Sequence, residues 1–356
     1  MKAKLALLAG DGIGPEIMDQ AVRVLRTIEQ KFEHEFQISE GLIGGAAINA
    51  TGNPYPDETH QLCLDADAVL FGAIGDPKYD NDPTAKIRPE QGLLAMRKKL
   101  GLFANLRPVK TYESLFERSP LKEDRLRGVD FMVVRELTGG IYFGRPSEVS
   151  ADGMNSVDTC LYSKEEILRV SKMAFDLSMK SKKKLTLVDK ANVLSTSRLW
   201  RKTVQEISTD YPEVEVEYLF VDNAAMQLII RPNQFDVMLT ENMFGDILTD
   251  EASVLPGSIG LQPSASVGVK TAIFEPIHGS YPQATGKNIA NPFGMILSVA
   301  MMLDYQFGLK NEAALIQKAV DQALKEGIGT PDLFPENQQG TDEVASWILK
   351  YIHQPN

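Results

Sequence analysis

Short apolar runs alternate with longer amphipathic segments along the whole chain, and this alternation limits the fold more than any other feature. The short runs predict strands at residues 4–9, 68–74, 130–135, 185–188, 217–221, 235–240 and 272–274. The longer segments predict helices at residues 15–31, 163–180, 198–208 and 311–325. Alternating strands and helices are typical of an α/β protein.

Length and charge argue against several classes of protein. A chain of 356 residues exceeds one ordinary core and fits two domains. Its formal net charge of −11 argues against general binding to nucleic acid or anionic membranes, which needs clustered Lys and Arg. No segment approaches the roughly 20 apolar residues that cross a bilayer, and two isolated cysteines do not form a disulfide framework. We therefore expect a soluble, cytoplasmic protein without nucleic-acid or membrane partners.

Residues 140–162 differ from the rest, because they mix Gly, Ser and Asp with alternating Val and Tyr. This pattern predicts a protruding β-hairpin arm, although an ordinary surface loop has a similar composition. The helix that follows is predicted to begin at Ser163, since Glu166 three positions later completes a capping box.

Residues 10–15, GDGIGP, form a glycine-rich turn between the first predicted strand and the first predicted helix. The dinucleotide-binding fingerprint G-x-G-x-x-G would need a glycine at position 15, where this chain has Pro15. Nicotinamide chemistry therefore cannot be inferred from this turn, which by itself is most often only a tight connection.

Two aspartates four residues apart, Asp246 and Asp250, are expected on one face of a helix. Such a pair more often belongs to a solvated helix face. Like charges at this spacing also suit a cation between them, and oxygen ligands without nearby Cys or His favour Mg²⁺ or Mn²⁺. Asp222, at the end of a predicted strand, is a candidate third ligand, because open α/β sheets place their sites at strand ends.

Five further residues carry functional chemistry in this pattern. Arg97, Arg107 and Arg135 would bind a dicarboxylate bidentately, although each alone is more typically a surface or salt-bridged arginine. Lys190 follows a predicted strand, where burial and neighbouring cations can turn a lysine into a general base. Tyr142, in a glycine-rich turn, is a candidate proton donor or relay, a role that most single tyrosines do not have.

Residues 275–292 combine glycine with polar side chains after a predicted strand. This composition suits close approach of the backbone to a cofactor, but it also suits a long connecting loop. Asn291 is expected to cap a helix that begins at Pro292.

The order and wording of these motifs resemble the β-decarboxylating isocitrate/isopropylmalate dehydrogenase family across nearly the whole chain. The shared motifs are GDGIGPE, the arginine cluster, a Tyr after a glycine-rich turn, K-x-N, DxxxD within NMFGDILTDE and E-P-x-H-G-S. The resemblance implies an α/β fold of two domains that is not a Rossmann fold. Residues 1–102 and 257–356 would form an outer, cofactor-binding domain. Residues 103–256 would form an inserted metal and dimerisation domain, with its arm near 140–162.

The resemblance also implies a mechanism at a site shared across a homodimer. Lys190 and Tyr142 would be catalytic, with Lys190 taking the C2 hydroxyl proton and Tyr142 protonating the enol carbon. Asp222, which also meets the substrate and comes with Lys190 from the partner subunit, would join Asp246 and Asp250 around Mg²⁺ or Mn²⁺. The substrate's carboxylates would be held by Arg97, Arg107 and Arg135.

The expected substrate is 3-isopropylmalate, which would place the protein in leucine biosynthesis. Residues 88–94, RPEQGLL, resemble the isopropylmalate members, with Glu90, Leu93 and Leu94 beside the isopropyl group and Val193 offered by the partner. Burial of that group contributes roughly 2 kcal/mol, at about 0.8 kcal/mol per carbon. A carboxylate there would lose hydration and face Glu90.

NAD is the expected cofactor, with one departure from the family pattern. The residues expected to bind it are His278, Gly279, Ser280, Gln283, Gly286 and Asn291. NAD-specific members are expected to carry an acid at position 283, where it binds the ribose and repels a 2′-phosphate. Gln283 keeps hydrogen bonds but not charge, so discrimination against NADP is expected to be looser.

Three alternatives remain open from the sequence. One is a related family activity on tartrate, alkylmalate or homoisocitrate. Another is a non-catalytic binding or regulatory homologue, which typically loses a metal carboxylate, the Lys or the Tyr, all present here. The third is a structural metal protein in which Asp246 and Asp250 only stabilise the fold.

Overall fold

The computed structural model of the chain describes residues 1–80, 85–336 and 339–354. Two compact units divide it: Met1–Leu102 with Pro256–Asn356, and Phe103–Leu255. We call these the discontinuous unit and the inserted unit. Among the described residues, no helix is both long and apolar enough to cross a membrane.

The discontinuous unit contains a five-strand sheet segment in the order β2-β1-β3-β12-β11. Its strands are β1 (Lys2–Gly10), β2 (Glu35–Glu40), β3 (Ala68–Ala73), β11 (Pro263–Val267) and β12 (Ala272–Pro276). All pairings are parallel except that of β11 with β12, which is antiparallel. Every residue of β3 is buried, as expected for a strand covered on both faces.

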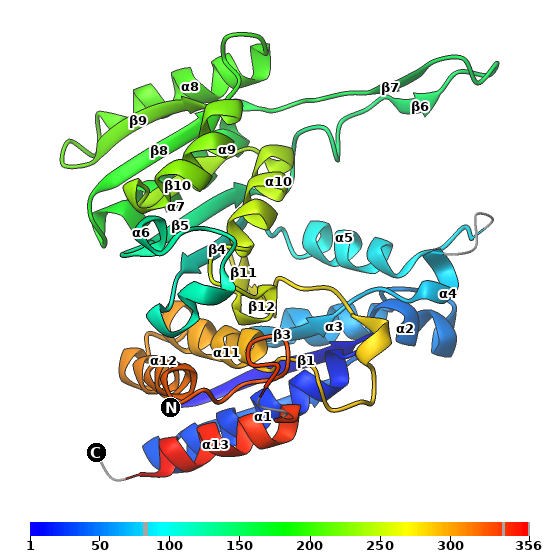
Figure 1. Ribbon diagram of the computed structural model, residues 1–356. Helices are drawn as coiled ribbons and strands as arrows, with labels where there is room; N and C mark the ends of the chain where they lie inside the picture. Colours follow the sequence, from blue (N-terminus) through cyan, green and yellow to red (C-terminus); the bar gives the residue numbers. More distant parts are fainter. Residues whose placement is uncertain (81–84, 337–338, 355–356) are drawn as a thin grey trace. The chain divides into compact units, whose positions relative to one another are not determined.

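Helices cover both faces of this segment (Figure 1). They are α1 (Gly14–Phe32), α2 (Gly44–Thr51), α3 (Asp57–Asp65), α4 (Pro77–Asp80), α5 (Pro89–Lys99), α11 (Phe293–Tyr305), α12 (Lys310–Lys325) and α13 (Thr341–His353), with short 3-10 turns at Ile259–Leu261 and Pro282–Ala284. One face packs Leu8 and Phe71 against α2, α3 and α5. The helix α11 is buried almost throughout, which explains its unbroken apolar sequence.

The inserted unit contains a second segment in the order β4-β5-β10-β8-β9. Its strands are β4 (Ala104–Lys110), β5 (Asp130–Glu136), β8 (Lys184–Asp189), β9 (Glu215–Phe220) and β10 (Val237–Thr240). Only β4 runs antiparallel to its neighbour β5. Since β5, β10, β8 and β9 are parallel, their carboxyl ends lie at one edge of the segment.

The longer helices of this unit form two pairs, α9 (Val221–Ile230) with α10 (Asn242–Ser253) and α7 (Lys164–Met179) with α8 (Ser195–Ser208). The unit also contains α6 (Glu123–Leu126), with 3-10 turns at Glu113–Arg118 and Pro232–Gln234. Helices α9 and α10 lie together over a core that includes Val133, Met238 and Leu248. Helices α7 and α8 pack together and contact the same strands. Alternation along each strand therefore sends odd-numbered residues of β5, including Arg135, toward α10.

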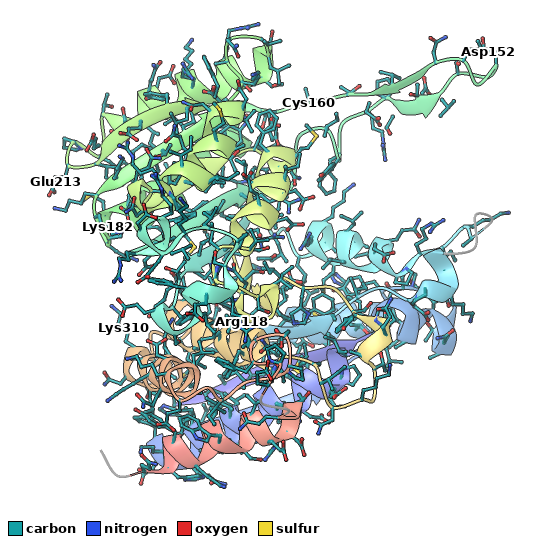
Figure 2. All side chains as sticks on the ribbon, in the orientation of Figure 1. Arg118, Asp152, Cys160, Lys182, Glu213 and Lys310 are labelled. Carbon is teal, nitrogen blue, oxygen red and sulfur yellow. The ribbon has the colours of Figure 1, made fainter. Side chains whose placement is uncertain are left out.

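An antiparallel hairpin lies within residues 140–162, formed by β6 (Ser147–Val149) and β7 (Ser156–Asp158). It projects from the inserted unit, with Asp152 at its tip and Cys160 near its base (Figures 1 and 2). All six strand residues are exposed. Neither cysteine is in a disulfide.

The structure confirms the α/β fold, and each predicted strand and helix is present with ends shifted by a few residues. Ser163 caps α7 by accepting a bond of 3.2 Å from the Glu166 amide, which confirms the capping box. One boundary was wrong: Val221 belongs to α9 rather than to the preceding strand, so Asp222 lies in the first turn of a helix.

Candidate active site

Helix α10 carries Asp246 and Asp250 one turn apart and begins directly after β10. Arg135 forms an ion pair with Asp246. Arg107 lies 3.4 Å from Asp250 and donates to Thr249 at 2.7 Å. The side chains of Asp246 and Asp250 remain 40% and 70% exposed, so both carboxylates keep oxygens available to a ligand.

The two arginines are buried and fixed by asparagines. Arg107 donates through Nε to Asn105 at 2.7 Å, and Asn105 is fully buried on the same strand. Arg135 donates through Nη2 to Asn242 at 2.9 Å. The neutral asparagines orient the guanidinium groups, whose facing charges are the carboxylates of Asp246 and Asp250, and a guanidinium group held in this way suits carboxylates.

Tyr142 lies at the start of the arm segment and donates a hydrogen bond of 2.9 Å to Oδ2 of Asp246. Partial burial, followed by this bond and the charge of Asp246, raises the pKa of the Tyr142 hydroxyl above its ordinary value. The phenol therefore stays protonated at neutral pH. Its ring is partly exposed, so it can approach a ligand at the α10 carboxylates.

Lys190 follows β8 directly and donates through Nζ to Asp222 at 2.6 Å. This bond holds the pKa of Asp222 below its ordinary value. Val193, in the turn after Lys190, is exposed. The described residues contain no group of three His, Cys, Asp or Glu side chains able to hold a metal ion, so Asp222 does not join Asp246 and Asp250 within this chain.

In the discontinuous unit, α5 carries Glu90, Leu93, Leu94 and Arg97 at a spacing that places them on one helix face. Glu90 and Leu94 are exposed, and Leu93 packs partly against the core. Arg97 lies 3.2 Å from Glu275 of β12, while its Nε is buried without a hydrogen-bond partner among the described residues. This helix face therefore combines two leucine side chains with a guanidinium group.

The predicted cofactor loop lies against the glycine-rich turn that precedes α1. The Ser280 carbonyl accepts a bond of 2.8 Å from the Ile13 amide. A Cβ at Gly12 would meet that carbonyl oxygen at 2.0 Å, so the approach requires glycine. Gly279, Gln283 and Gly286 are exposed along the loop.

Two polar side chains, His278 and Asn291, lie at the two ends of this loop. Burial lowers the pKa of His278, whose Nε2 has no hydrogen-bond partner within the described residues. Asn291 accepts a bond of 3.0 Å from the Phe293 amide and donates to Asp332 at 3.0 Å. The predicted cap was wrong by one residue: α11 begins at Phe293 with Pro292 as its N-cap, and Asn291 binds the first helical amide from the position before the cap.

The sequence matches the family described as isocitrate/isopropylmalate dehydrogenase over residues 4–348. A protein named 3-isopropylmalate dehydrogenase from Bacteroides fragilis strain YCH46 is 56% identical over 99% of this chain and 100% of its own length. One of the same name from Bacillus subtilis strain 168 is 52% identical, over 98% of each chain. The chain belongs to the isocitrate/isopropylmalate dehydrogenase family.

Solved structures of the family agree. The isocitrate dehydrogenase from Methylococcus capsulatus has a TM-score of 0.89 and 33% identity, covering 99% of this chain and 100% of its own. A β-decarboxylating dehydrogenase from Thermococcus kodakarensis has a TM-score of 0.80 and 35% identity, covering 98% of this chain and 96% of its own. The family and the fold predicted from the motifs are thereby confirmed.

Two residues that hold the candidate site together were not predicted from the sequence. Asp11 is buried and accepts bonds from the amides of Gly45, Ala46 and Gly75 at 2.8 to 3.0 Å, so it joins the start of α2 and the segment after β3 to the glycine-rich turn. Asn242 binds Arg135 from the first residue of α10. The sequence features that could have pointed to them are an aspartate inside a glycine-rich turn, for Asp11, and an asparagine at the start of a helix, for Asn242.

The residues present fit the groups that the family implies. Asp246 and Asp250 offer exposed, hard oxygen donors from one helix, as Mg²⁺ or Mn²⁺ requires. The 278–291 loop offers the orphaned His278 nitrogen and an exposed, glycine-rich backbone, which suit a polar cofactor at close approach.

Proposed function

We propose that this chain catalyses the NAD-dependent oxidative decarboxylation of 3-isopropylmalate to 2-oxo-4-methylpentanoate, a step of leucine biosynthesis in the cytoplasm. The observation that carries this proposal is near full-length similarity to proteins named 3-isopropylmalate dehydrogenase. The proposal is also supported by the family motifs, which are retained here with their lysine, tyrosine, arginine and aspartate residues.

The chain's own residues have separate roles in this reaction. When bound, NAD supplies the hydride acceptor and Mg²⁺ or Mn²⁺ supplies Lewis-acid stabilisation of negative charge on the C2 oxygen. Asp246, Asp250 and Asp222 would hold the cation. Lys190 takes the proton of the C2 hydroxyl, and Tyr142 gives a proton to the carbon that has lost CO₂.

Positioning of the substrate is assigned to the arginines and to α5. Arg97, Arg107 and Arg135 bind its carboxylates. Arg107 and Arg135 are already held in place by hydrogen bonds to asparagines. Leu93 and Leu94 lie beside the isopropyl group. Glu90, one turn earlier on the same face, repels the third carboxylate of isocitrate. Val193 would complete this pocket from a second copy.

We propose a homodimer that completes each site. Supporting this are the separation of Asp222 from Asp246 and Asp250 and the apolar surface of two adjacent helices. The exposed apolar residues of α9, of α10 and of the residue that caps α10 are Met226, Ile229, Ile230, Ile247 and Val254. Apolar residues gathered in this way on a soluble protein mark an association surface. The arm adds Val149, Met154 and Val157 to the exposed apolar surface.

Residues 1–102 with 257–356 would bind NAD, through His278, Gly279, Ser280, Gln283, Gly286 and Asn291. Residues 103–256 would hold the cation and form the dimer. Because Gln283 is neutral, it binds the ribose hydroxyls without repelling a 2′-phosphate, so we expect NAD preference with measurable NADP activity.

The test is a set of initial rates of NAD⁺ reduction with 3-isopropylmalate, isocitrate and malate, each with Mn²⁺ and with chelator. Cation-dependent turnover that strongly favours 3-isopropylmalate supports the proposal. Preference for isocitrate or malate would keep the family but reject the assignment of Glu90, Leu93 and Leu94. No turnover of any of the three would favour tartrate, alkylmalate, homoisocitrate or a non-catalytic role.

A further inference from the structure

The turn that carries Lys190 is held by side chains of α8. The Lys190 amide donates to Ser197 Oγ at 3.0 Å. Arg198 donates through Nη1 to the carbonyl oxygens of Ala191 at 3.3 Å and Val193 at 3.1 Å. The backbone on both sides of Lys190 is therefore fixed to one helix.

An ion pair between the buried Asp189 and the half-buried Arg201 lies next to this turn. Asp189, the last residue of β8, accepts two hydrogen bonds from Arg201, at 2.8 Å from Nε and 2.9 Å from Nη2. Oδ1 of Asp189 also accepts a bond of 2.9 Å from the Ala191 amide. The Asp189 side chain is only 2% exposed, so its orientation depends on these partners. One carboxylate thus fixes the residues immediately before and after Lys190.

The same guanidinium group contacts the neighbouring strand. Its centre lies 5.2 Å from the ring of Tyr218 and 5.3 Å from the ring of Phe220, both on β9. Phe220 is paired directly with Asp189 in the sheet register, and Asp222 follows two residues later. The Lys190 ammonium lies 6.0 Å from the Phe220 ring. Arg201 therefore contacts both strands whose ends carry Lys190 and Asp222.

We propose that Arg201, acting through Asp189 and Phe220, is a positioning residue that sets the Lys190 ammonium against Asp222. The inference rests on the proposed function, in which Lys190 takes the hydroxyl proton. A bidentate guanidinium–carboxylate pair fixes direction as well as distance, which a single point charge does not. An ion pair of this kind adds little net stability compared with a well-packed apolar pair. Its role is therefore assigned to the direction in which it holds the Asp189 carboxylate.

The test compares Arg201→Met, Arg201→Lys and a control, Lys202→Gln, whose side chain on the same helix is 74% exposed. Misplacement of a catalytic group by about 1 Å lowers rates roughly a hundredfold. We expect Arg201→Met to lower kcat for 3-isopropylmalate by about tenfold to a hundredfold, with KM for substrate and NAD changed less than about threefold. Arg201→Lys should recover part of kcat, and Lys202→Gln should match the unmodified enzyme.

A second measurement does not depend on turnover. Hydrogen–deuterium exchange of the 189–194 segment should rise at least about tenfold in Arg201→Met and stay unchanged in Lys202→Gln, since the Ala191 amide loses a fixed acceptor. Unchanged exchange, or faster exchange without loss of kcat, would overturn the inference. If Arg201→Met does not fold, the same comparison is made with Arg201→Lys. No turnover by the unmodified enzyme would instead reject the proposed function, and the exchange result would still decide the positioning role.

Discussion

Gly245 of α10 lies directly against the side chain of Arg135, so that a Cβ at position 245 would stand 2.6 Å from Arg135 Cγ. The glycine lets the buried arginine pass along the helix and reach Asp246 and Asn242. The aspartate-bearing helix and the arginine strand can approach this closely only because residue 245 has no side chain.

Gly245→Ala is therefore expected to displace Arg135. We expect KM for 3-isopropylmalate to rise about tenfold and the free energy of unfolding to fall by about 1–3 kcal/mol, the usual cost of overpacking. Substrate kinetics and thermal unfolding measure both effects. Gly128→Ala is the matched control, because Gly128 has a φ of +71° in the same unit and no atom near its Cβ position. It should lose stability without a change in KM, and equal KM values in both variants would contradict the role given to Gly245.

Leu94 offers a test of substrate choice, because it is 44% exposed and contributes little to the core. If Leu94 lies beside the isopropyl group as proposed, Leu94→Ala removes apolar area worth about 1–2 kcal/mol at roughly 0.8 kcal/mol per carbon. We expect kcat/KM for 3-isopropylmalate to fall about tenfold while kcat/KM for malate stays nearly constant. A parallel fall for both acids would show that Leu94 acts on the whole site rather than on the substituent.

The sequence was most informative about features that depend on residues close together in the chain. Short apolar runs predicted the strands β5, β8 and β10, and four-residue spacing placed Asp246 and Asp250 on one helix, because these patterns are local. The partner of Arg135 could not be predicted in the same way, because Asn242 binds it from the start of α10, 107 residues away in the chain. Asn105, in contrast, lies two residues before Arg107 on β4, so that contact is local.

The motif assignments came from family resemblance rather than from geometry. Nothing local in residues 189–201 indicates that Asp189 would be buried against Arg201, since twelve residues and a change from strand to helix separate them. The αL conformation of Tyr281, with φ of 38°, is likewise set by the loop's contacts and not by its own preference.

Glu241, which precedes α10, predicts a pH-dependent stability. Burial, and then the charge of Glu136, raises the pKa of its carboxyl to about 7. Its Oε2 is buried and has no hydrogen-bond partner in the part of the chain that the structure describes. Because the folded pKa is the higher one, the neutral form is favoured in the fold. Its contribution to stability is present below the unfolded pKa, near 4.5, and is lost as pH rises through about 7.

Glu241→Gln should therefore stabilise the protein at pH 8, where the unmodified carboxyl is ionised. The expected gain is roughly 3 kcal/mol at most, from about 1.4 kcal/mol per pKa unit. Melting temperatures measured from pH 5 to pH 8 should fall less steeply for this variant than for the unmodified protein. Glu113→Gln, at a side chain that is 84% exposed, should leave the slope unchanged. Identical slopes for all three proteins would reject the burial argument.

Asp250→Asn tests the cation site with little risk to the fold. The Asp250 side chain is 70% exposed, and its contact with Arg107 is long at 3.4 Å, so its charge contributes little to stability. Loss of one anionic ligand should raise the Mn²⁺ concentration for half-maximal activity by about a hundredfold, because outer partners alone change metal affinity by 10- to 100-fold. With chelator present, the melting temperature should match that of the unmodified protein. At a Mn²⁺ concentration that saturates the unmodified protein but lies well below the variant's requirement, only the unmodified protein should gain thermal stability, since stabilisation follows the affinity of the folded state for the ligand. An unaltered Mn²⁺ requirement would remove Asp250 from the cation site and leave the pair as a solvated face of α10.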